Sequence, residues 1–219
     1  MKIGTFTAVA ISAVAFLAAP MTSWAGGTVE GKVSFSGKAP APKEFLFSKF
    51  PNPKFCVKNT SKDAKGEKRL LKEVEVGKDG SLKNAVVAVM GINDEKFQAD
   101  FKGEEIIAKL CEFLPYTGVV VANQSSFRVM NTDADPDDPK SVKGVLHNPH
   151  SFEVKGTSNT TIFNIGLPEK DKGLDKPIKL RKAADGSVFK LICDQHEFMQ
   201  FWGLPVTSPH YAVVGEDGK

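Results

Sequence analysis

The sequence predicts an all-β protein, a Greek-key β-sandwich or barrel with an N-terminal strand extension and long loops. Three observations support this class: many short segments alternate apolar and polar residues, turn residues stand between them, and amphipathic helical stretches are almost absent. Short strands separated by turn signals are typical of antiparallel sandwiches and barrels. The 219 residues are 41% hydrophobic and 25% charged, a globular composition that excludes a disordered chain.

The first 25 residues are predicted to be a secretory signal peptide. Lys2 precedes an apolar stretch, and Ser23-Trp24-Ala25 has the small-x-small pattern of a cleavage site. The apolar stretch is short for a membrane span, which needs about 20 apolar residues. We therefore expect a bacterial, periplasmic or secreted mature domain over 26–219 with no membrane span. The 29 basic residues nearly balance the 26 acidic ones, which argues against nucleic-acid binding.

The first half of the mature chain shows strand patterns and one short helical candidate. Pro51 and Pro53 exclude a long helix from the Lys-rich stretch 43–69. Residues 26–80 either complete the sandwich or form a small β extension. Strands are expected at 28–37, 70–76, 82–90 (buried on both faces) and 117–122, and a short helix at 104–110.

The second half is richer in strands, which are expected at 126–131, 151–154, 160–165, 177–180, 187–192 and 211–214. Between the first two lies a polar loop, residues 132–145. Its start has a calcium-like D-x-D-x-D spacing, but Gly144 stands where a calcium loop needs its bidentate Glu. We therefore expect a solvated acidic loop. The Lys run over 54–72 is expected to be a solvated face, or a surface that steers an acidic partner.

The chain has three cysteines, so at least one stays outside an intramolecular disulfide. Cys56 and Cys111 have neither a His nor a second Cys within a few residues, and we expect them to pair with each other. Cys193 differs, because it begins the run Cys193-Asp194-Gln195-His196-Glu197-Phe198-Met199.

That run places a thiolate, an imidazole and a thioether at C-x2-H-x2-M spacing. A second imidazole is available upstream in His147-Asn148-Pro149-His150. Soft thiolate and thioether donors combined with imidazoles suit copper, and a His2Cys set with a distant Met is the blue-copper arrangement. Zinc fits less well, since structural zinc takes Cys and His ligands. His210 is expected to be a structural residue.

Both motifs resemble the ligand motifs of the cupredoxin family. The spacing from Cys193 to Met199 is that of the amicyanin-type copper loop, and His147-Asn148-Pro149-His150 resembles its H-N-x-H stretch. The strand Gly31-Lys32-Val33-Ser34-Phe35-Ser36-Gly37 and the two further cysteines are similar to those of exported bacterial cupredoxin-like proteins. The resemblance implies one mononuclear copper per chain. Its expected ligands are His147, Cys193 and His196, with Met199 as the weak axial ligand.

Two details separate this chain from the family pattern. An insertion follows Asn131-Thr132-Asp133, which leaves His147 and His150 as alternatives for the upstream ligand. The metal loop reads His196-Glu197-Phe198-Met199 where the family often has H-P-W-M. In the family the loop His lies at the solvent edge, so His196 is the expected exit route for electrons.

The resemblance implies a one-electron carrier with a redox partner protein, such as a c-type cytochrome or a periplasmic oxidoreductase. With all expected copper positions filled by protein, no independent enzyme activity is expected. One alternative is a periplasmic copper-handling protein that stores, delivers or senses copper with the same ligands. Another is a structural β-domain with a vestigial site.

Overall fold

The computed structural model describes residues 27–61, 63–215 and 217–219, so the predicted signal peptide lies outside the described residues. The chain divides into two compact units, Met1–Glu30 and Gly31–Lys219. All regular elements of the described residues belong to the second unit, and nearly all are strands. The helices are short: α1 (Pro53–Cys56), α2 (Glu95–Asp100) and the 3-10 turns η1 (Phe47–Lys49) and η2 (Ala183–Asp185). The all-β prediction is confirmed.

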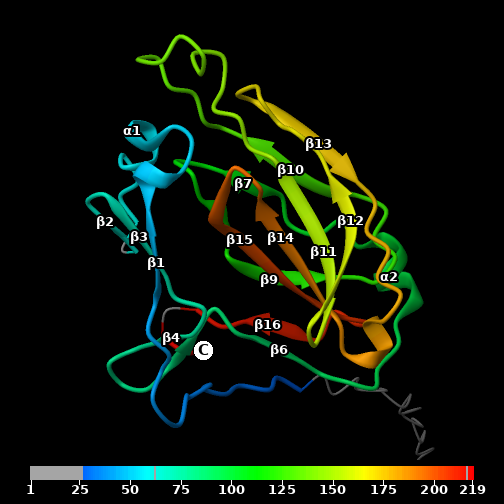
Figure 1. Cartoon of the computed structure of the whole chain (residues 1–219). Helices are drawn as coiled ribbons and strands as arrows, with labels where there is room; N and C mark the ends of the chain where they lie inside the picture. Colours follow the sequence, from blue (N-terminus) through cyan, green and yellow to red (C-terminus); the bar gives the residue numbers. More distant parts are fainter. Residues whose placement is uncertain (1–26, 62, 216) are drawn as a thin grey trace, which may run out of the picture. The chain divides into compact units, whose positions relative to one another are not determined.

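Two sheets form the main body (Figure 1). The larger has the strand order β12-β11-β14-β15-β9 and the smaller the order β13-β10-β7-β8. Most neighbours are antiparallel, but β9 pairs with β15, and β7 with β10, in parallel. The larger sheet consists of β9 (Thr117–Val120), β11 (Pro149–Lys155), β12 (Ser158–Asn164), β14 (Val188–Cys193) and β15 (His196–Pro205). The smaller consists of β7 (Ile106–Ala108), β8 (Phe113–Leu114), β10 (Phe127–Asn131) and β13 (Lys172–Lys176).

The two sheets enclose one aromatic and aliphatic core. The Phe127 ring of the smaller sheet lies 4.8 Å from Phe189 and 5.9 Å from Phe201 of the larger sheet, measured between ring centroids. All three side chains are at most 2% exposed. Aromatic contacts at these distances add to the burial of apolar area that stabilises a sandwich. The sheets therefore pack face to face.

An N-terminal lobe, residues 43–71, packs beside this body. Its sheet has the order β1-β3-β2 and is followed along the chain by smaller pairs. The Cys56–Cys111 disulfide ties the lobe to the turn between β7 and β8. The remaining strands are β1 (Lys43–Leu46), β2 (Ala64–Lys65), β3 (Lys68–Leu71), β4 (Glu75–Val76), β5 (Leu82–Lys83), β6 (Val86–Ala88) and β16 (Tyr211–Val213).

Several expected elements differ from the structure. The helix expected over 104–110 is the strand β7, in which Ile106 and Ala108 are buried and Ile107 faces out, because pairing with β10 imposes a period of two. The strand expected over 28–37 has only an isolated bridge, Ser34 to Ser81.

The stretch 82–90 is not a buried strand. It forms two short strands, and Val87 and Met90 are 49% and 80% exposed. Residues 177–180 form no strand, although Ile178 and Leu180 donate backbone hydrogen bonds to the 122–124 segment. Among the described residues, no helix is both long and apolar enough to cross a membrane.

Candidate metal centre

Three side chains that are distant in sequence converge at one end of the sandwich. The Cys193 Sγ lies 3.8 Å from His147 Nδ1 and 3.7 Å from His196 Nδ1, and the three donor atoms lie within 4.8 Å of one another. Each of the three residues is 0% exposed. Three clustered donors in a buried position form a candidate metal centre.

A tight hairpin brings two of the donors together. Cys193 ends β14 and His196 begins β15, and the two are register partners across the Asp194-Gln195 turn. The C-x2-H spacing is thus the spacing across a two-residue hairpin loop. His147 stands just before β11 and forms an isolated antiparallel bridge with Leu167, which holds its backbone beside Cys193.

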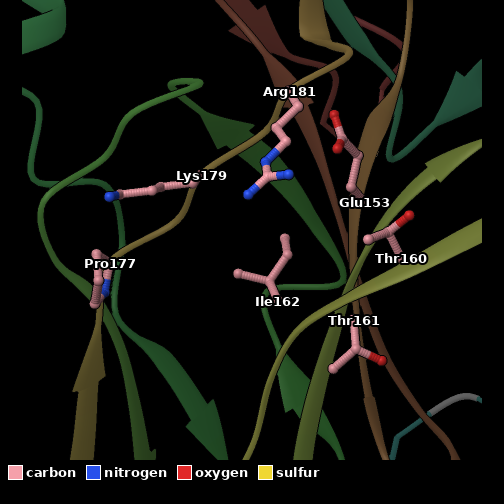
Figure 2. Close-up of a pocket in the computed structure, with 7 residues that line it drawn as sticks. All are labelled: Glu153, Thr160, Thr161, Ile162, Pro177, Lys179 and Arg181. Carbon is pink, nitrogen blue, oxygen red and sulfur yellow. The ribbon is translucent and has the colours of Figure 1, made fainter.

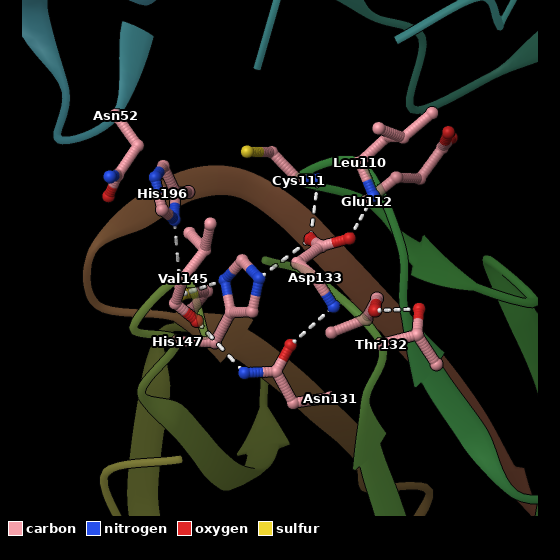
Figure 3. A network of polar contacts seen from close by, with 12 residues as sticks. Asn52, Leu110, Cys111, Glu112, Asn131, Thr132, Asp133, Val145, His147 and His196 are labelled. Carbon is pink, nitrogen blue, oxygen red and sulfur yellow. Dashed lines mark hydrogen bonds and ion pairs between the residues drawn. The ribbon is translucent and has the colours of Figure 1, made fainter. Parts of the chain in front are cut away.

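The remaining nitrogen of each imidazole is already engaged, and Figure 3 shows the contact of His147 with Asp133. His147 Nε2 lies 2.8 Å from a carboxylate oxygen of Asp133, and His196 Nε2 lies 3.0 Å from the carbonyl oxygen of Pro51. Both partners accept hydrogen bonds, so each imidazole donates through Nε2 and turns Nδ1 toward Cys193. Such an outer hydrogen bond is what fixes the tautomer of metal-binding histidines.

The sulfur is prepared as a thiolate. The Asn148 backbone N–H donates to Cys193 Sγ at 3.3 Å. Burial opposes the charged form, but the hydrogen bonds and charges of His147 and His196 outweigh it and lower the pKa of Cys193 to about 6. Metal ligation requires this deprotonated form.

The contact with Cys193 that lowers the pKa of the thiol raises the pKa of His147. Burial disfavours its protonation, but the Asp133 carboxylate and the Cys193 sulfur outweigh burial and raise the pKa of His147 to about 9. Without a metal, a proton on His147 therefore compensates the thiolate. A bound cation would take over this compensation, and its binding would then release a proton.

The donor spacing fits a first-row metal. Bonds of about 2.3 Å to sulfur and 2.0–2.1 Å to nitrogen, at a trigonal angle, separate the two donor atoms by roughly 3.8 Å. The observed S–N distances are 3.8 and 3.7 Å. Both sulfur–nitrogen distances therefore match those that a trigonal ion would require.

Of the two histidines that the sequence left open, the structure brings His147 to Cys193. His150 turns away, and its two ring nitrogens lie near Asp194 (3.0 Å) and Thr161 (3.0 Å). Met199 is fully buried in the irregular stretch of β15 between His196 and Gln200. Its assignment as the axial ligand stays a prediction. His210 is exposed and lies outside the cluster.

The prediction that His196 lies at the solvent-exposed edge of the site is wrong. The imidazole is completely buried, because the N-terminal lobe covers it. Phe198 is the centre of the contact: its ring lies 5.1 Å from Phe50 and 5.4 Å from Phe47. This cluster fixes the segment that carries the Pro51 carbonyl, while the Pro51 ring itself is exposed.

The prediction that the acidic loop is exposed to solvent is also wrong for its first two carboxylates. Asp133 and Asp135 are 2% and 4% exposed. Asp135 forms an ion pair with Lys58 at 3.2 Å, and Asp133 contacts His147. Sequence reasoning missed Asp133 as a site residue, although its place after the strand end at Asn131 was a usable signal. A backbone carbonyl such as that of Pro51 gives no sequence signal.

A second His/Cys group consists of Cys56, Cys111 and His196. The two sulfurs are bonded to each other, so they are not free to bind a metal. Cys193 is a free and buried cysteine.

Away from the centre, a shallow hollow lies between β12 and the segment 177–181 (Figure 2). Lys179 and Arg181 on its rim are exposed, and its carboxylate, Glu153, already accepts hydrogen bonds from Lys182 N and Ser187 Oγ. This arrangement leaves no buried polar group aimed at a ligand, so the hollow is not a second candidate site.

No protein-family model and no curated protein sequence matches the chain. Structurally, it resembles three copper-protein or cupredoxin structures, each with 12–16% identity and a TM-score of 0.32–0.33. These are a Cu-containing nitrite reductase from Thermus scotoductus SA-01 (14% identity, TM-score 0.33, 56% of this chain, 25% of that chain), a purple cupredoxin from Nitrosopumilus maritimus (16%, 0.33, 47% and 98%) and a methionine-to-alanine mutant of amicyanin with Cu(I) (12%, 0.32, 57% and 94%).

The chain thus spans about a quarter of the nitrite reductase. Because these likenesses are distant, we base the assignment of the centre on its own geometry.

Proposed function

We propose that the protein is an exported one-electron carrier with one mononuclear blue-copper site. Copper would be held by the Nδ1 atoms of His147 and His196 and the thiolate of Cys193, and Met199 would be the weak fourth ligand. One observation carries the proposal: two imidazoles, each hydrogen-bonded through Nε2 to an acceptor, direct their Nδ1 atoms at one buried cysteine sulfur. Export rests on the predicted signal peptide over 1–25.

The donor set favours copper over zinc. Thiolate and thioether sulfur are soft donors that suit Cu(I), and imidazole serves both oxidation states. When bound, copper supplies reversible one-electron redox chemistry. The protein contributes a donor set that needs little movement, since the turn, the sheet and two outer hydrogen bonds hold it before the metal arrives.

The closed site also favours electron transfer over catalysis. Phe198 and the Pro51 segment cover His196, and the four expected ligand positions are supplied by protein. A catalytic metal keeps an open position for substrate or water. We therefore propose no independent enzyme activity. His196 Nε2 lies 3.0 Å from the carbonyl oxygen of Pro51, an exposed residue, so electrons exchanged with a c-type cytochrome or a periplasmic oxidoreductase would pass there.

A copper titration of the mature chain, residues 26–219, tests the proposal. We expect one equivalent to produce an intense thiolate-to-Cu(II) absorption that ascorbate bleaches and air or ferricyanide restores. Cys193→Ser should abolish the band. The matched control is His210→Gln, which changes an exposed imidazole outside the cluster and should leave the spectrum unchanged.

The outcome separates the alternatives. Reversible cycling without copper loss supports a carrier, whereas transfer of the metal to a chelator within minutes would indicate copper storage or delivery. A chain that takes up no copper, or a band that survives in Cys193→Ser, would refute the site.

A further inference from the structure

A buried carboxylate stands directly behind one of the two histidines. Asp133 is 2% exposed, and its side chain accepts hydrogen bonds from three donors: His147 Nε2 at 2.8 Å, the Leu110 N–H at 2.5 Å and the Cys111 N–H at 3.0 Å. Hydrogen bonds donated to a carboxylate favour its charged form. His147 is thus one of three N–H donors that converge on the same carboxylate.

The local backbone is arranged to hold this charge. Leu110 and Cys111 form the two-residue turn between β7 and β8, and both adopt left-handed conformations with φ of +48° and +56°. Residues other than Gly, Asn and Asp rarely adopt this backbone conformation. In this turn it directs two successive N–H groups at Asp133. Unusual backbone of this kind, held by its surroundings, is common at functional sites.

The main chain of Asp133 is fixed as well. Its N–H donates to Asn131 Oδ1 at 2.9 Å, and its carbonyl accepts from the Val145 N–H at 2.9 Å. The Asn131 amide in turn donates to the carbonyls of Val145 and Leu167. Figure 3 shows this network leading from the strand end to the ring of His147. The carboxylate is therefore held in one orientation.

The two histidines differ in what lies behind them. His196 donates to Pro51, a neutral carbonyl, while His147 donates to an anion. An anionic acceptor draws the Nε2 proton toward itself and makes Nδ1 a stronger donor, which stabilises a doubly charged metal ion more than a singly charged one.

We propose that Asp133 is a positioning residue that fixes the tautomer of His147 and shifts the copper equilibrium toward Cu(II). This inference rests on the proposed function, since it concerns the same centre. It assigns to an acidic residue of the 132–145 loop a role in setting the reduction potential.

Asp133→Asn tests the inference, because it removes the charge and keeps the size. The matched control is Asp135→Asn, which neutralises another buried carboxylate of the same loop that pairs with Lys58 instead of a histidine. We expect Asp133→Asn to lower the ratio of Cu(II) to Cu(I) affinity at least tenfold, which raises the one-electron potential by about 59 mV. Asp135→Asn should change the ratio less than twofold. Equal shifts in both variants, or none in Asp133→Asn, would overturn the inference.

A measurement on the metal-free parent keeps this test independent of copper binding. A nitrogen-15 NMR pH series, read where the His147 ring carries a single proton, should show that proton on Nε2. A proton on Nδ1 would overturn the role of Asp133 even if Asp133→Asn does not fold. Failure of the proposed function is a separate result: the NMR outcome stands, but the parent takes up no copper.

Discussion

Removing the Cys56–Cys111 disulfide should destabilise the protein strongly. The bridge joins residues separated by 55 positions. The loop-entropy model gives about 4 kcal/mol at 25 °C for a loop of this length. A domain typically has 5–15 kcal/mol of total stability. The Cys56→Ala/Cys111→Ala variant should therefore fold, but with a much smaller free energy of unfolding.

The variant should stay folded because other contacts hold the lobe. Asn59 donates to the Leu110 carbonyl at 2.8 Å, and Arg69 forms an ion pair with Glu112. Asn52 reaches Ser141 at 2.7 Å. These contacts preserve the position of Pro51 at room temperature, but they open more readily than a covalent bond.

Urea unfolding measures the effect. We expect a lower midpoint and a slightly larger m-value, because the unfolded chain expands when the loop is cut. The parent unfolded and refolded under reducing conditions should match the double variant. A loss of less than about 1 kcal/mol would refute the loop-entropy reasoning and indicate that strain in the native bridge offsets its benefit.

Three further outcomes can be checked. Phe198→Ala should lower the free energy of unfolding by about 3–5 kcal/mol, because the ring is 2% exposed within an aromatic cluster; a loss under 1 kcal/mol in urea would contradict this packing. Glu153→Gln tests a pH effect. Burial raises the pKa of Glu153, but hydrogen bonds from Lys182 N–H and the Ser187 hydroxyl outweigh burial and lower it. Because the pKa of Glu153 is lower in the folded than in the unfolded state, where it is about 4.3, the ionised carboxylate stabilises the fold at higher pH, and this contribution is lost as the pH falls through the folded-state pKa. Glu153→Gln should therefore lose less stability than the parent between pH 6 and 3. Parallel plots of unfolding free energy against pH for the two proteins would exclude the effect. Met199→Leu keeps the volume, so its stability should change by less than about 1.5 kcal/mol, while the reduction potential of the copper form shifts; an unchanged potential would remove Met199 from the ligand set.

The sequence predicted the strands that are buried on one face. The strand expected at 126–131 is β10, and that at 187–192 is β14, because alternating apolar residues report directly which face is covered. The prediction failed where pairing with a neighbouring strand decides between helix and strand. Ile106 and Ala108 lie in a short strand whose identity depends on pairing with β10, and such pairing has no local signature.

The site shows the same division. Cys193 and His196 could be grouped from the sequence because a tight turn makes their spacing local. The sequence left His147 and His150 as alternatives, because the insertion before them hides which imidazole reaches the sulfur; the structure places His147 there. The burial of His196 was not predictable. It depends on a segment about 145 positions earlier in the chain, whose hydrogen bond to the imidazole comes from a backbone carbonyl, that of Pro51.

The disulfide connects the two groups that stand behind the histidines. On one side, Cys56 belongs to α1, just after the segment whose Pro51 carbonyl holds His196. On the other side, Cys111 lies in the turn whose N–H groups hold Asp133, and Asp133 holds His147. One covalent bond therefore restrains both outer hydrogen-bond partners, although neither cysteine binds the metal. The orientation of each imidazole depends on its own partner, so a change at Pro51 or at Asp133 alone should disturb only one histidine. Removal of the disulfide should disturb both histidines together.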